Sequence, residues 1–519
     1  MGRPRRVFLF WLLLAWLSTA QACNFPLFAL RPGAVGVEQF RLTLTALSLP
    51  TSPGATPVPA VTGVLAQTPI TGQQPGTPPP PAPTSALIDN VYVYPVQSGD
   101  TLESVAARFS VETALITSSQ PVPAGVYLPP GQVLYIPNRL GELAGLPPVM
   151  PDSEVVYSPS SAGFSIQEYV DGASGYLSAY QELVDGEALT GVQIVQKVAL
   201  ENSINPRLLL AFLEHRSGWV LGRPDRPDDA HPIGFNVPDY RGLYKELVLS
   251  ATHLGVGYYG WRSGDRTVLS FSDGSGIRLD PTLNAGSVAV QALFAKFFRL
   301  SDLEADLYGE QGFLQLYNQM FGDFSARVVE PLLPPGLAQP GLELPFTPGE
   351  RWSFSGGPHL TWNSGSPRGA IDFSPVTGQA PCVATNAWVT ASASGLVTRS
   401  AYNTVVIDLD GDGHEQTGWD LLYFHVADRD RIQAGTPVQV NDPLGHPSCE
   451  RGAATGTHVH FARKYNGEWL PAASPLPFIL SGWILQGGAR SYEGTLVNGD
   501  QVVSANPGGS RQSIIIRGQ

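Results

Sequence analysis

The histidines of this chain gather near its C-terminus, at spacings that suit metal chemistry. Six of the nine histidines lie between His359 and His460, among short β-rich runs separated by turns. In the run GTHVHF, His458 and His460 are two residues apart, so on a strand both side chains point to the same face. The run YFH supplies His425 from a neighbouring strand. These side chains are therefore expected to project into one groove of a mostly antiparallel sheet.

A carboxylate completes a possible set of metal ligands. His359, in the run GGPH, precedes Asp372 by 13 residues, and together with His460 they form a set of two histidines and one carboxylate. Three protein ligands with a fourth position open to water are typical of catalytic zinc, whereas structural sites use four. Zinc lowers the pKa of bound water to about 7 and polarises a carbonyl group. We therefore predict a Zn²⁺ site that hydrolyses an amide bond.

Residues 345–480 resemble the M23 zinc metallopeptidases, and within them the β-lytic metalloendopeptidase subgroup. The runs GGPH, YFH, GHPSCERG and GTHVHF carry this resemblance. It implies a mostly antiparallel β peptidase domain that cuts the peptide part of bacterial peptidoglycan. The resemblance assigns roles residue by residue: His359, Asp372 and His460 bind the metal, and His425 and His458 act as transition-state stabilisers or base.

Two positions qualify this resemblance. The commoner M23 pattern places a histidine four residues before the aspartate, at the position held here by Arg368. Arginine has no lone pair to offer a metal, so only the β-lytic spacing, with His359 further upstream, gives a complete site. The tyrosine that steadies the oxyanion in the family has no certain counterpart, and Tyr492 is the candidate.

The N-terminus predicts export. Arg3, Arg5 and Arg6 precede an apolar run at 7–17 that is too short for a membrane span, and Ala20-Gln21-Ala22 is a small-residue cleavage site. Residues 1–22 are therefore expected to be a signal peptide. The next residue, Cys23, resembles the lipidated cysteine of bacterial lipoproteins, although Ala20 stands where a leucine is usual. The protein is thus expected outside the cytoplasm, either lipid-anchored through Cys23 or secreted.

The two remaining cysteines are expected to pair. If Cys23 carries lipid, Cys382 and Cys449 are left as an even pair in an exported domain. Such a pair is more often a disulfide than two free thiols. Zinc ligation by these cysteines is the weaker interpretation, because neither lies in a C-x-x-C motif.

A small glycan-binding module is expected at residues 92–138. The runs VQSGDTLESVAARF and LPPGQVLYIP resemble the two halves of a LysM module, a βααβ fold that binds glycans containing N-acetylglucosamine. The preceding residues, 23–91, are dominated by Pro, Thr, Gly, Ala and Ser, a composition typical of an extended linker. A second linker is expected at 139–162.

Residues 163–335 are predicted to form a mainly α-helical domain. The run VALENSINPRLLLAFLEHRSGW is similar to the active-site region of lysozyme-like lytic transglycosylases. In that family a glutamate acts as general acid at the place that Arg216 holds here. Arginine cannot donate a proton at neutral pH, and Glu214 lies two residues away on another side of the helix. We therefore expect a structural or binding role, with a second, glycan-cleaving site as the alternative.

An acidic run interrupts the peptidase-like region. Asp408, Asp410 and Asp412 alternate with Leu409 and glycine, like the start of a calcium-binding loop. Position 12 of such a loop, which is acidic in EF-hands, is Trp419 here. The sequence therefore favours an acidic hairpin turn.

Composition limits the partners of this protein. Its 519 residues carry a formal net charge of −13, and no basic run is present. Nucleic acid is therefore not expected as a partner, because phosphate affinity rests on clustered Lys and Arg. The expected partner is peptidoglycan, with its glycan bound by the LysM module and its stem or cross-bridge peptide bound by the peptidase domain. The membrane enters only through a lipid anchor, and residues 481–519 are expected to be a β extension.

The sequence thus predicts a multidomain, exported zinc metalloendopeptidase of peptidoglycan. The alternative is a non-catalytic M23 scaffold that binds wall or activates another hydrolase. Arg368 favours this alternative, and the complete set of three ligands and two further histidines opposes it.

Overall fold

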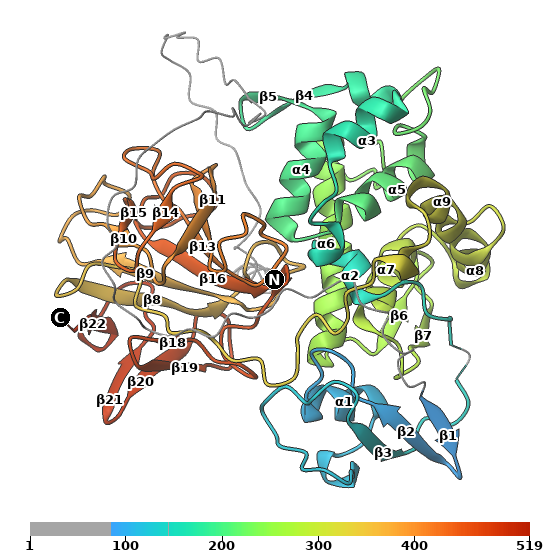
Figure 1. The fold of residues 1–519 in the computed structure, drawn as a ribbon, viewed down its shortest axis with the longest axis horizontal. Helices are drawn as coiled ribbons and strands as arrows, with labels where there is room; N and C mark the ends of the chain where they lie inside the picture. The colour runs from blue at the N-terminus through green and yellow to red at the C-terminus, as the bar shows by residue number, and fades with distance from the viewer. Residues whose placement is uncertain (1–84, 144, 519) are drawn as a thin grey trace, which may run out of the picture. The chain divides into compact units, whose positions relative to one another are not determined.

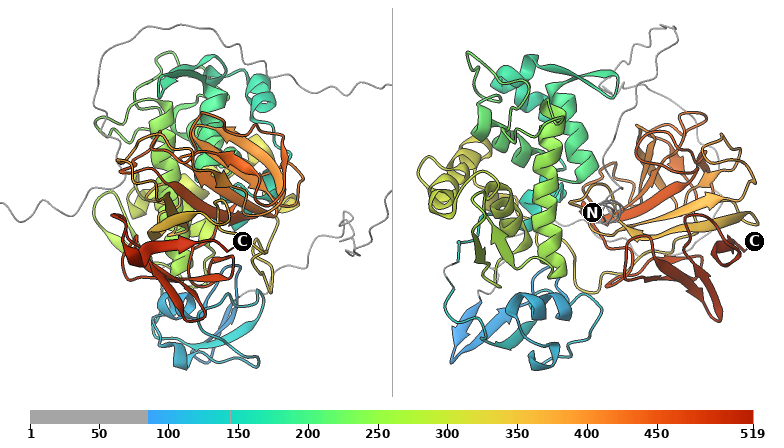
Figure 2. Two further views of the ribbon diagram at one scale, coloured as in Figure 1. Left: turned by 90° about the vertical axis from the view of Figure 1, so that its left-hand side faces the viewer. Right: turned by 180° about the vertical axis from the view of Figure 1, so that it is seen from behind.

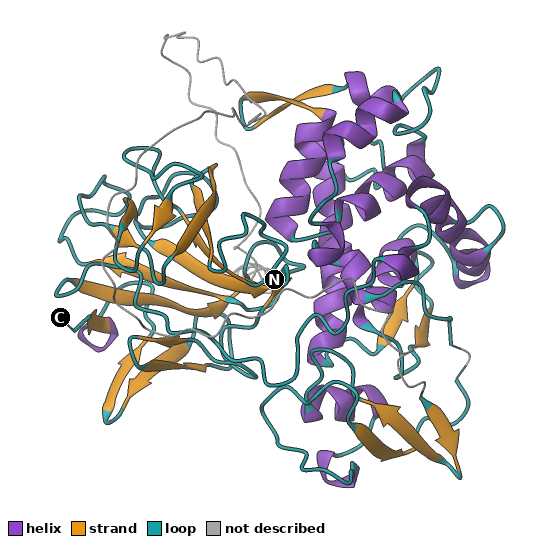
Figure 3. Ribbon diagram, viewed as in Figure 1, coloured by secondary structure: helices purple, strands orange, loops and turns teal. Residues whose placement is uncertain are grey.

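The computed structural model of the chain describes residues 85–143 and 145–518 (Figure 1). The predicted signal peptide at 1–22, Cys23 and residues 24–84 of the first predicted linker lie outside the described residues. Among the helices of the described part, none combines the length and the apolar character that crossing a membrane requires. Helices are concentrated in the middle of the described chain and strands in its C-terminal part (Figure 3).

The first unit, which includes the predicted LysM module, is a three-stranded antiparallel sheet with one α-helix. Its helix begins after Thr101, whose hydroxyl forms a capping box with Ser104. The second helix expected for a βααβ unit is reduced to a 3₁₀ turn, because the chain that follows contains Pro121, Pro123, Pro129 and Pro130. The elements are β1 (Ala86–Ile88), β2 (Val91–Pro95), α1 (Leu102–Phe109), η1 (Thr113–Leu115) and β3 (Val133–Pro137), with strand order β1-β2-β3.

The apolar run predicted as helical around 194–213 forms two helices. The first, α4 (Gly191–Asn202), begins with a capping box between Thr190 and Gln193. The second, α5 (Pro206–Ser217), is capped by Asn205, whose side chain accepts a hydrogen bond from the backbone N–H of Arg207. Proline lacks an N–H group and is favoured at the first helical position, which explains the break between the two helices.

The longest helix of the described chain is α6 (Leu243–Ser263), which packs closely on α7 (Ala285–Phe294) (Figure 2). Gly257 permits this approach, since a Cβ atom there would lie 2.7 Å from the Cα of Ala289. The other helices of this region are α2 (Asp152–Val155), α3 (Ile166–Ala173), α8 (Leu300–Tyr308) and α9 (Phe313–Phe321), with 3₁₀ turns η2 (Pro159–Ser161), η3 (Tyr176–Ala179) and η4 (Phe324–Ala326). Two short hairpins complete it: β4 (Gln181–Val184) with β5 (Glu187–Thr190), and β6 (Val268–Ser270) with β7 (Gly276–Arg278).

The helical region begins earlier than the sequence suggested. Within the predicted linker at 139–162, α2 is formed, and Val149, Val155 and Val156 are buried in the same apolar core as α4 to α7. These apolar residues are spaced between Pro and Ser residues, so their pattern did not stand out from a linker composition.

A large antiparallel sheet dominates the C-terminal region, as predicted (Figure 1). Its strand order is β14-β11-β12-β13-β16-β9-β8-β22, with β17 paired to β16. Phe373, Val405, Tyr423 and Phe461 from four of its strands share one buried core. The strands are β8 (Arg351–His359), β9 (Ala370–Pro375), β11 (Gly395–Ala401), β12 (Thr404–Asp408), β13 (Trp419–Phe424), β14 (Pro437–Val438), β16 (Val459–Tyr465), β17 (Glu468–Trp469) and β22 (Ile514–Ile516). A separate pair is formed by β10 (Val389–Thr390) and β15 (Pro443–Gly445).

The last segment of the chain is part of this region. The expected boundary at 480 falls inside a four-stranded sheet of β18 (Ile479–Leu480), β19 (Trp483–Gly487), β20 (Gly494–Asn498) and β21 (Gln501–Ser504). After the 3₁₀ turn η5 (Arg511–Ser513), β22 pairs with β8. Residues 481–518 are therefore continuous with the large sheet, because β22 is one of its strands.

Candidate metal centre

Three neighbouring strands deliver the three predicted metal ligands. Asp372 on β9 and His460 on β16 are direct partners in the antiparallel register. His359 ends β8, where two register shifts between Phe354 and His359 bend the strand. Residues opposite each other on adjacent strands point to the same face, so the pairing brings these side chains together. All three are buried.

The three side chains converge on one point. His359 Nε2 and His460 Nδ1 each lie 3.3 Å from Asp372 Oδ1, and the two nitrogen atoms are 3.0 Å apart. Tetrahedral zinc with ligand distances of about 2.0–2.1 Å would separate its ligand atoms by roughly 3.3 Å. Asp372 Oδ1 is buried and has no hydrogen-bond partner among the described residues. Such an orphaned carboxylate oxygen is costly unless a cation satisfies it, so the residues fit a zinc ion.

Backbone carbonyl groups orient both histidines of this cluster. His359 Nδ1 lies 2.9 Å from the carbonyl oxygen of Gly357, and His460 Nε2 lies 2.9 Å from that of Thr361. A carbonyl oxygen only accepts, so each of these ring nitrogens carries the proton. The opposite nitrogens therefore turn lone pairs toward Asp372, as is usual for metal-binding histidines.

The Asp372 carboxylate dominates the electrostatics of the cluster. Burial alone raises the pKa of Asp372, but the neighbouring His359 and His458 outweigh it and hold that pKa well below its usual range. Burial lowers the pKa of His460. Burial acts in the same direction on His359, but the neighbouring Asp372 outweighs it and raises the pKa of that histidine. An ionised carboxylate and a neutral imidazole are the protonation states that metal ligation requires.

The two further histidines lie beside the three ligands. The rings of His425 and His458 have centroids 4.4 Å apart, and His458 Nε2 lies 3.9 Å from Asp372 Oδ1. His458 Nδ1 donates to the carbonyl oxygen of Gly456 at 2.7 Å. Burial, followed by the nearby His458 and His460, lowers the pKa of His425 to about 3. His425 is therefore neutral near pH 7, with one ring nitrogen protonated and the other carrying a lone pair.

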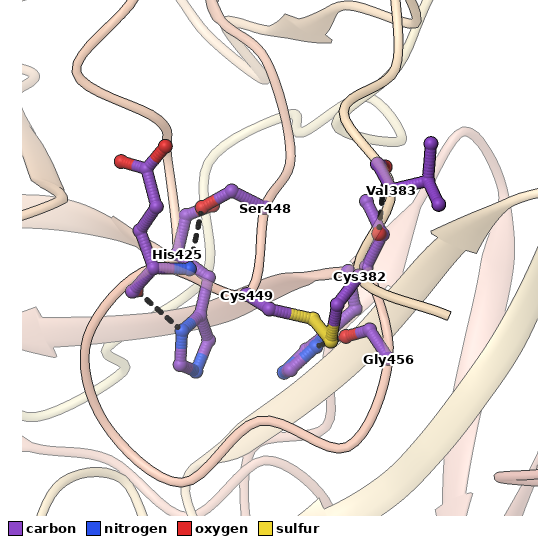
Figure 4. Close-up of a disulfide and its surroundings, with 9 residues drawn as sticks. Cys382, Val383, His425, Ser448, Cys449 and Gly456 are labelled. Atoms are coloured by element: carbon purple, nitrogen blue, oxygen red, sulfur yellow. Dashed lines mark hydrogen bonds between the residues drawn. A yellow bond between two sulfur atoms is a disulfide. The ribbon is translucent and has the colours of Figure 1, made fainter. Parts of the chain in front are cut away.

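A disulfide lies next to the backbone segment that runs between these two histidines (Figure 4). Cys382 and Cys449, the cysteines expected to pair, are joined in the structure. Ser448, the neighbour of Cys449, donates to the carbonyl oxygen of His425 from both its backbone N–H and its hydroxyl, at 2.8 and 2.9 Å. The carbonyl oxygen of Ser448 in turn accepts from the N–H of His458 at 3.4 Å. The disulfide therefore fixes a strip of backbone between the two histidines.

Tyr492 and Arg368 both contact the segment around His359. The Tyr492 ring stacks on the His359 ring with centroids 4.2 Å apart, so it lies at the metal ligands. Arg368 donates to the carbonyl oxygens of Pro358 at 3.2 Å and of Arg490 at 2.6 Å. The guanidinium group at the position of the commoner M23 ligand thus ties backbone segments together.

In the helical region, the two residues weighed for glycan chemistry have structural contacts. Glu214 accepts hydrogen bonds from the N–H groups of Val220 and Leu221, both at 2.8 Å. The guanidinium of Arg216 lies 4.2 Å from the centre of the Phe297 ring. These contacts hold the turn after α5.

Sequence reasoning did not find the groups that orient the ligands. The carbonyl groups of Gly357, Thr361 and Gly456 belong to the backbone, and backbone groups leave no side-chain signature. The double glycine of GGPH was the one sequence signal for a close approach of another side chain to this strand. A Cβ atom on Gly356 would lie 2.6 Å from Asp372 Oδ2, so this glycine lets the aspartate approach β8.

Two stretches of the chain match known families. Residues 94–137 match the LysM domain. Residues 148–333 match the family described as LasA, N-terminal domain. The second match covers most of the helical region, and the resemblance to lysozyme-like transglycosylases is not confirmed.

Comparison with individual proteins points to metallopeptidases. The chain is similar to Protease LasA of Pseudomonas aeruginosa, with 27% identity over 286 residues that cover 52% of this chain and 64% of that protein. It is also similar to Beta-lytic metalloendopeptidase of Achromobacter lyticus, with 28% identity over 160 residues that cover 29% of this chain and 40% of that protein. Among solved structures, "A Novel M23 Metalloprotease Pseudoalterin from Deep-sea" aligns at 24% identity over 32% of this chain and 96% of that one, with a TM-score of 0.28.

The sequence matches place the chain among relatives of the metallopeptidases. More specifically, it is similar to the LasA and β-lytic proteins, and residues 94–137 match the LysM domain. The aligned part spans less than two thirds of the length of these two curated relatives.

Proposed function

We propose that this protein is an exported zinc metalloendopeptidase that hydrolyses peptide bonds of peptidoglycan. The observation that carries the proposal is the convergence of His359 Nε2, Asp372 Oδ1 and His460 Nδ1 at 3.0–3.3 Å from one another, with the buried Asp372 oxygen otherwise unpartnered. Bound there, zinc would supply Lewis acidity, which polarises a carbonyl group and makes water a stronger nucleophile near neutral pH.

The neighbouring residues have separate tasks in this proposal. One of the two further histidines, His425 or His458, takes the proton of the attacking water and returns it to the leaving amine, since each offers a ring nitrogen beside the cluster. Once that ring nitrogen has taken up the proton, its N–H group also stabilises the negative charge that develops on the carbonyl oxygen. Tyr492, stacked on His359, is the candidate for a further donor to that oxygen.

The LysM domain supports the choice of substrate. A domain that binds N-acetylglucosamine-containing glycan holds the peptidase near the peptides attached to that glycan, which raises their effective concentration. Cleavage then requires a location outside the cytoplasm, consistent with the predicted signal peptide and with Cys23 as a candidate lipid anchor.

One experiment separates the peptidase from the non-catalytic scaffold. The full exported chain is incubated with purified peptidoglycan, and newly formed amino groups are counted with and without a zinc chelator. We expect release of amino groups that the chelator stops and added zinc restores. Binding of peptidoglycan without any release, in a protein shown to contain zinc, would favour the scaffold. Release of reducing sugar ends instead would point to glycan cleavage.

A further inference from the structure

The acidic hairpin between β12 and β13 brings three carboxylates together. Oxygen atoms of Asp408, Asp410 and Asp412 lie within 4.8 Å of one another. The Asp408 carboxylate also accepts hydrogen bonds from the N–H groups of Asp410, Gly411 and Gly413. Acidic turns of this kind are common, so the cluster alone does not identify a ligand.

A fourth carboxylate, outside the turn, changes the interpretation. Asp420 on β13 is the direct partner of Asp408 on β12, so both side chains lie on the same face of the sheet. Asp420 is fully buried, and neither of its carboxylate oxygens has a hydrogen-bond partner among the described residues. A buried carboxylate in this condition is costly unless a cation compensates its charge.

The nearby basic side chains are engaged elsewhere. Lys464 on β16 is the cross-strand partner of Asp420 on β13, but its ammonium group binds Glu415 at 2.9 Å. Arg399 binds the same Glu415 at 2.8 Å. Within the described part of the chain, no Lys or Arg nitrogen lies within 4.0 Å of the carboxylates of Asp408, Asp410, Asp412 or Asp420. Four acidic groups therefore share one end of the hairpin. Burial raises the pKa of Asp420 well above its usual range, and the charge of Lys464 offsets this only in part.

The backbone of the turn holds the acidic groups close together, with Asp408 buried and Asp410 and Asp412 exposed. A Cβ atom on Gly418 would lie 2.3 Å from Asp410 Oδ2, so Asp410 folds over the backbone of the turn. Gly413, at the sixth position counted from Asp408, has φ of +86°, the conformation that favours the glycine of a calcium-binding loop. The sequence favoured a simple turn because Trp419 holds position 12 of the loop. In the folded chain the next residue, Asp420, offers a carboxylate instead, because strand pairing places it opposite Asp408.

We propose that Asp408, Asp410, Asp412 and Asp420 form a calcium-binding site, separate from the histidine cluster. The ligand set contains only oxygen atoms and carries excess negative charge, which suits Ca²⁺ better than zinc. Its effect is structural: the ion fastens the end of β12 to the start of β13, whose other end leads directly into His425. This site does not depend on the proposed peptidase activity.

The test uses the full-length, zinc-loaded protein and Ca²⁺ alone as the probe. We expect the melting temperature to rise with Ca²⁺ concentration, because an ion that binds only the folded state stabilises it by mass action. Titration calorimetry should give one saturating site per chain, with Mg²⁺ at equal concentration giving a smaller effect. The zinc content should stay constant throughout, which separates this result from any failure at the histidine cluster.

Two variants and a matched control decide the assignment. Asp412→Asn removes an exposed carboxylate and should weaken Ca²⁺ binding at least about tenfold, since ligand charge sets the affinity of such sites. Asp420→Asn should abolish the Ca²⁺ response while leaving the calcium-free protein at least as stable as the wild type. Asp500→Asn, an exposed residue in the turn between β20 and β21, should behave as the wild type. No Ca²⁺-dependent shift up to about 10 mM, or an equal shift in wild type and Asp412→Asn, would overturn the proposal.

Discussion

Asp372 and His460 face each other across β9 and β16, with His460 Nδ1 3.3 Å from Asp372 Oδ1. Slipping this register by one residue would turn every side chain of one strand to the other face of the sheet. The pairing of β9 with β16 therefore determines whether these two side chains meet, and the bend in β8 brings His359 to the same point. The cluster is a product of the sheet as much as of the histidine motif.

Removing either of the two further histidines should separate chemistry from metal binding. His425→Ala and His458→Ala are each expected to keep zinc, because His359, Asp372 and His460 form a complete ligand set. Each should lower the rate of peptidoglycan hydrolysis by roughly 10²- to 10⁴-fold, the usual contribution of general acid–base catalysis. The measurement is the rate of amino-group release beside metal analysis of the same sample.

The control for this pair is His253→Ala, which changes a histidine of α6 in the helical region. It should keep both zinc and rate. Wild-type hydrolysis in His425→Ala and His458→Ala would refute the roles assigned to them.

Loss of the disulfide should affect both stability and activity. Cys382→Ser with Cys449→Ser opens a loop with a sequence separation of 67 residues, which should cost a few kcal/mol of unfolding free energy, about 4 on the chain-entropy estimate. Because Ser448 holds the carbonyl of His425, hydrolysis should fall further than the folded fraction does. The measurement is urea unfolding beside the hydrolysis rate, with zinc content unchanged. An active double variant with wild-type stability would contradict this account.

Glu415 should stabilise the protein in a defined pH range. Burial raises its pKa, but Arg399 and Lys464 outweigh burial and lower the pKa to about 2 from the usual 4.5. A carboxyl group whose pKa is lower in the folded state contributes stability above its unfolded pKa and loses that contribution as the pH falls. Glu415→Gln should therefore lose about 3–5 kcal/mol of unfolding free energy at pH 7, because the buried Lys464 and the half-buried Arg399 lose the carboxylate that they share.

The difference between wild type and Glu415→Gln should be constant above about pH 5 and shrink between pH 4.5 and pH 2. Urea unfolding at a series of pH values measures it. A difference that does not change down to pH 2.5 would exclude the lowered pKa.

The sequence predicted that His359, Asp372 and His460 come together and that the sheet is antiparallel, because histidine spacing and strand alternation are local patterns. It did not predict that the segment after 480 supplies β22 to the main sheet, or that Val155 and Val156 belong to a core. Both depend on contacts between residues distant in sequence. For the same reason, Trp419 at position 12 argued against a calcium loop, while the pairing of Asp408 with Asp420 became visible only in the folded chain.

The central claim is tested most directly by zinc content and peptidoglycan hydrolysis in His359→Ala beside Arg368→Ala. The account predicts about one zinc per chain in the wild type, and loss of both zinc and hydrolysis in His359→Ala. Arg368→Ala should keep its zinc and part of its activity, since this side chain holds backbone carbonyls and does not touch the metal ligands. Full zinc occupancy and wild-type hydrolysis in His359→Ala would contradict the assignment of the metal centre.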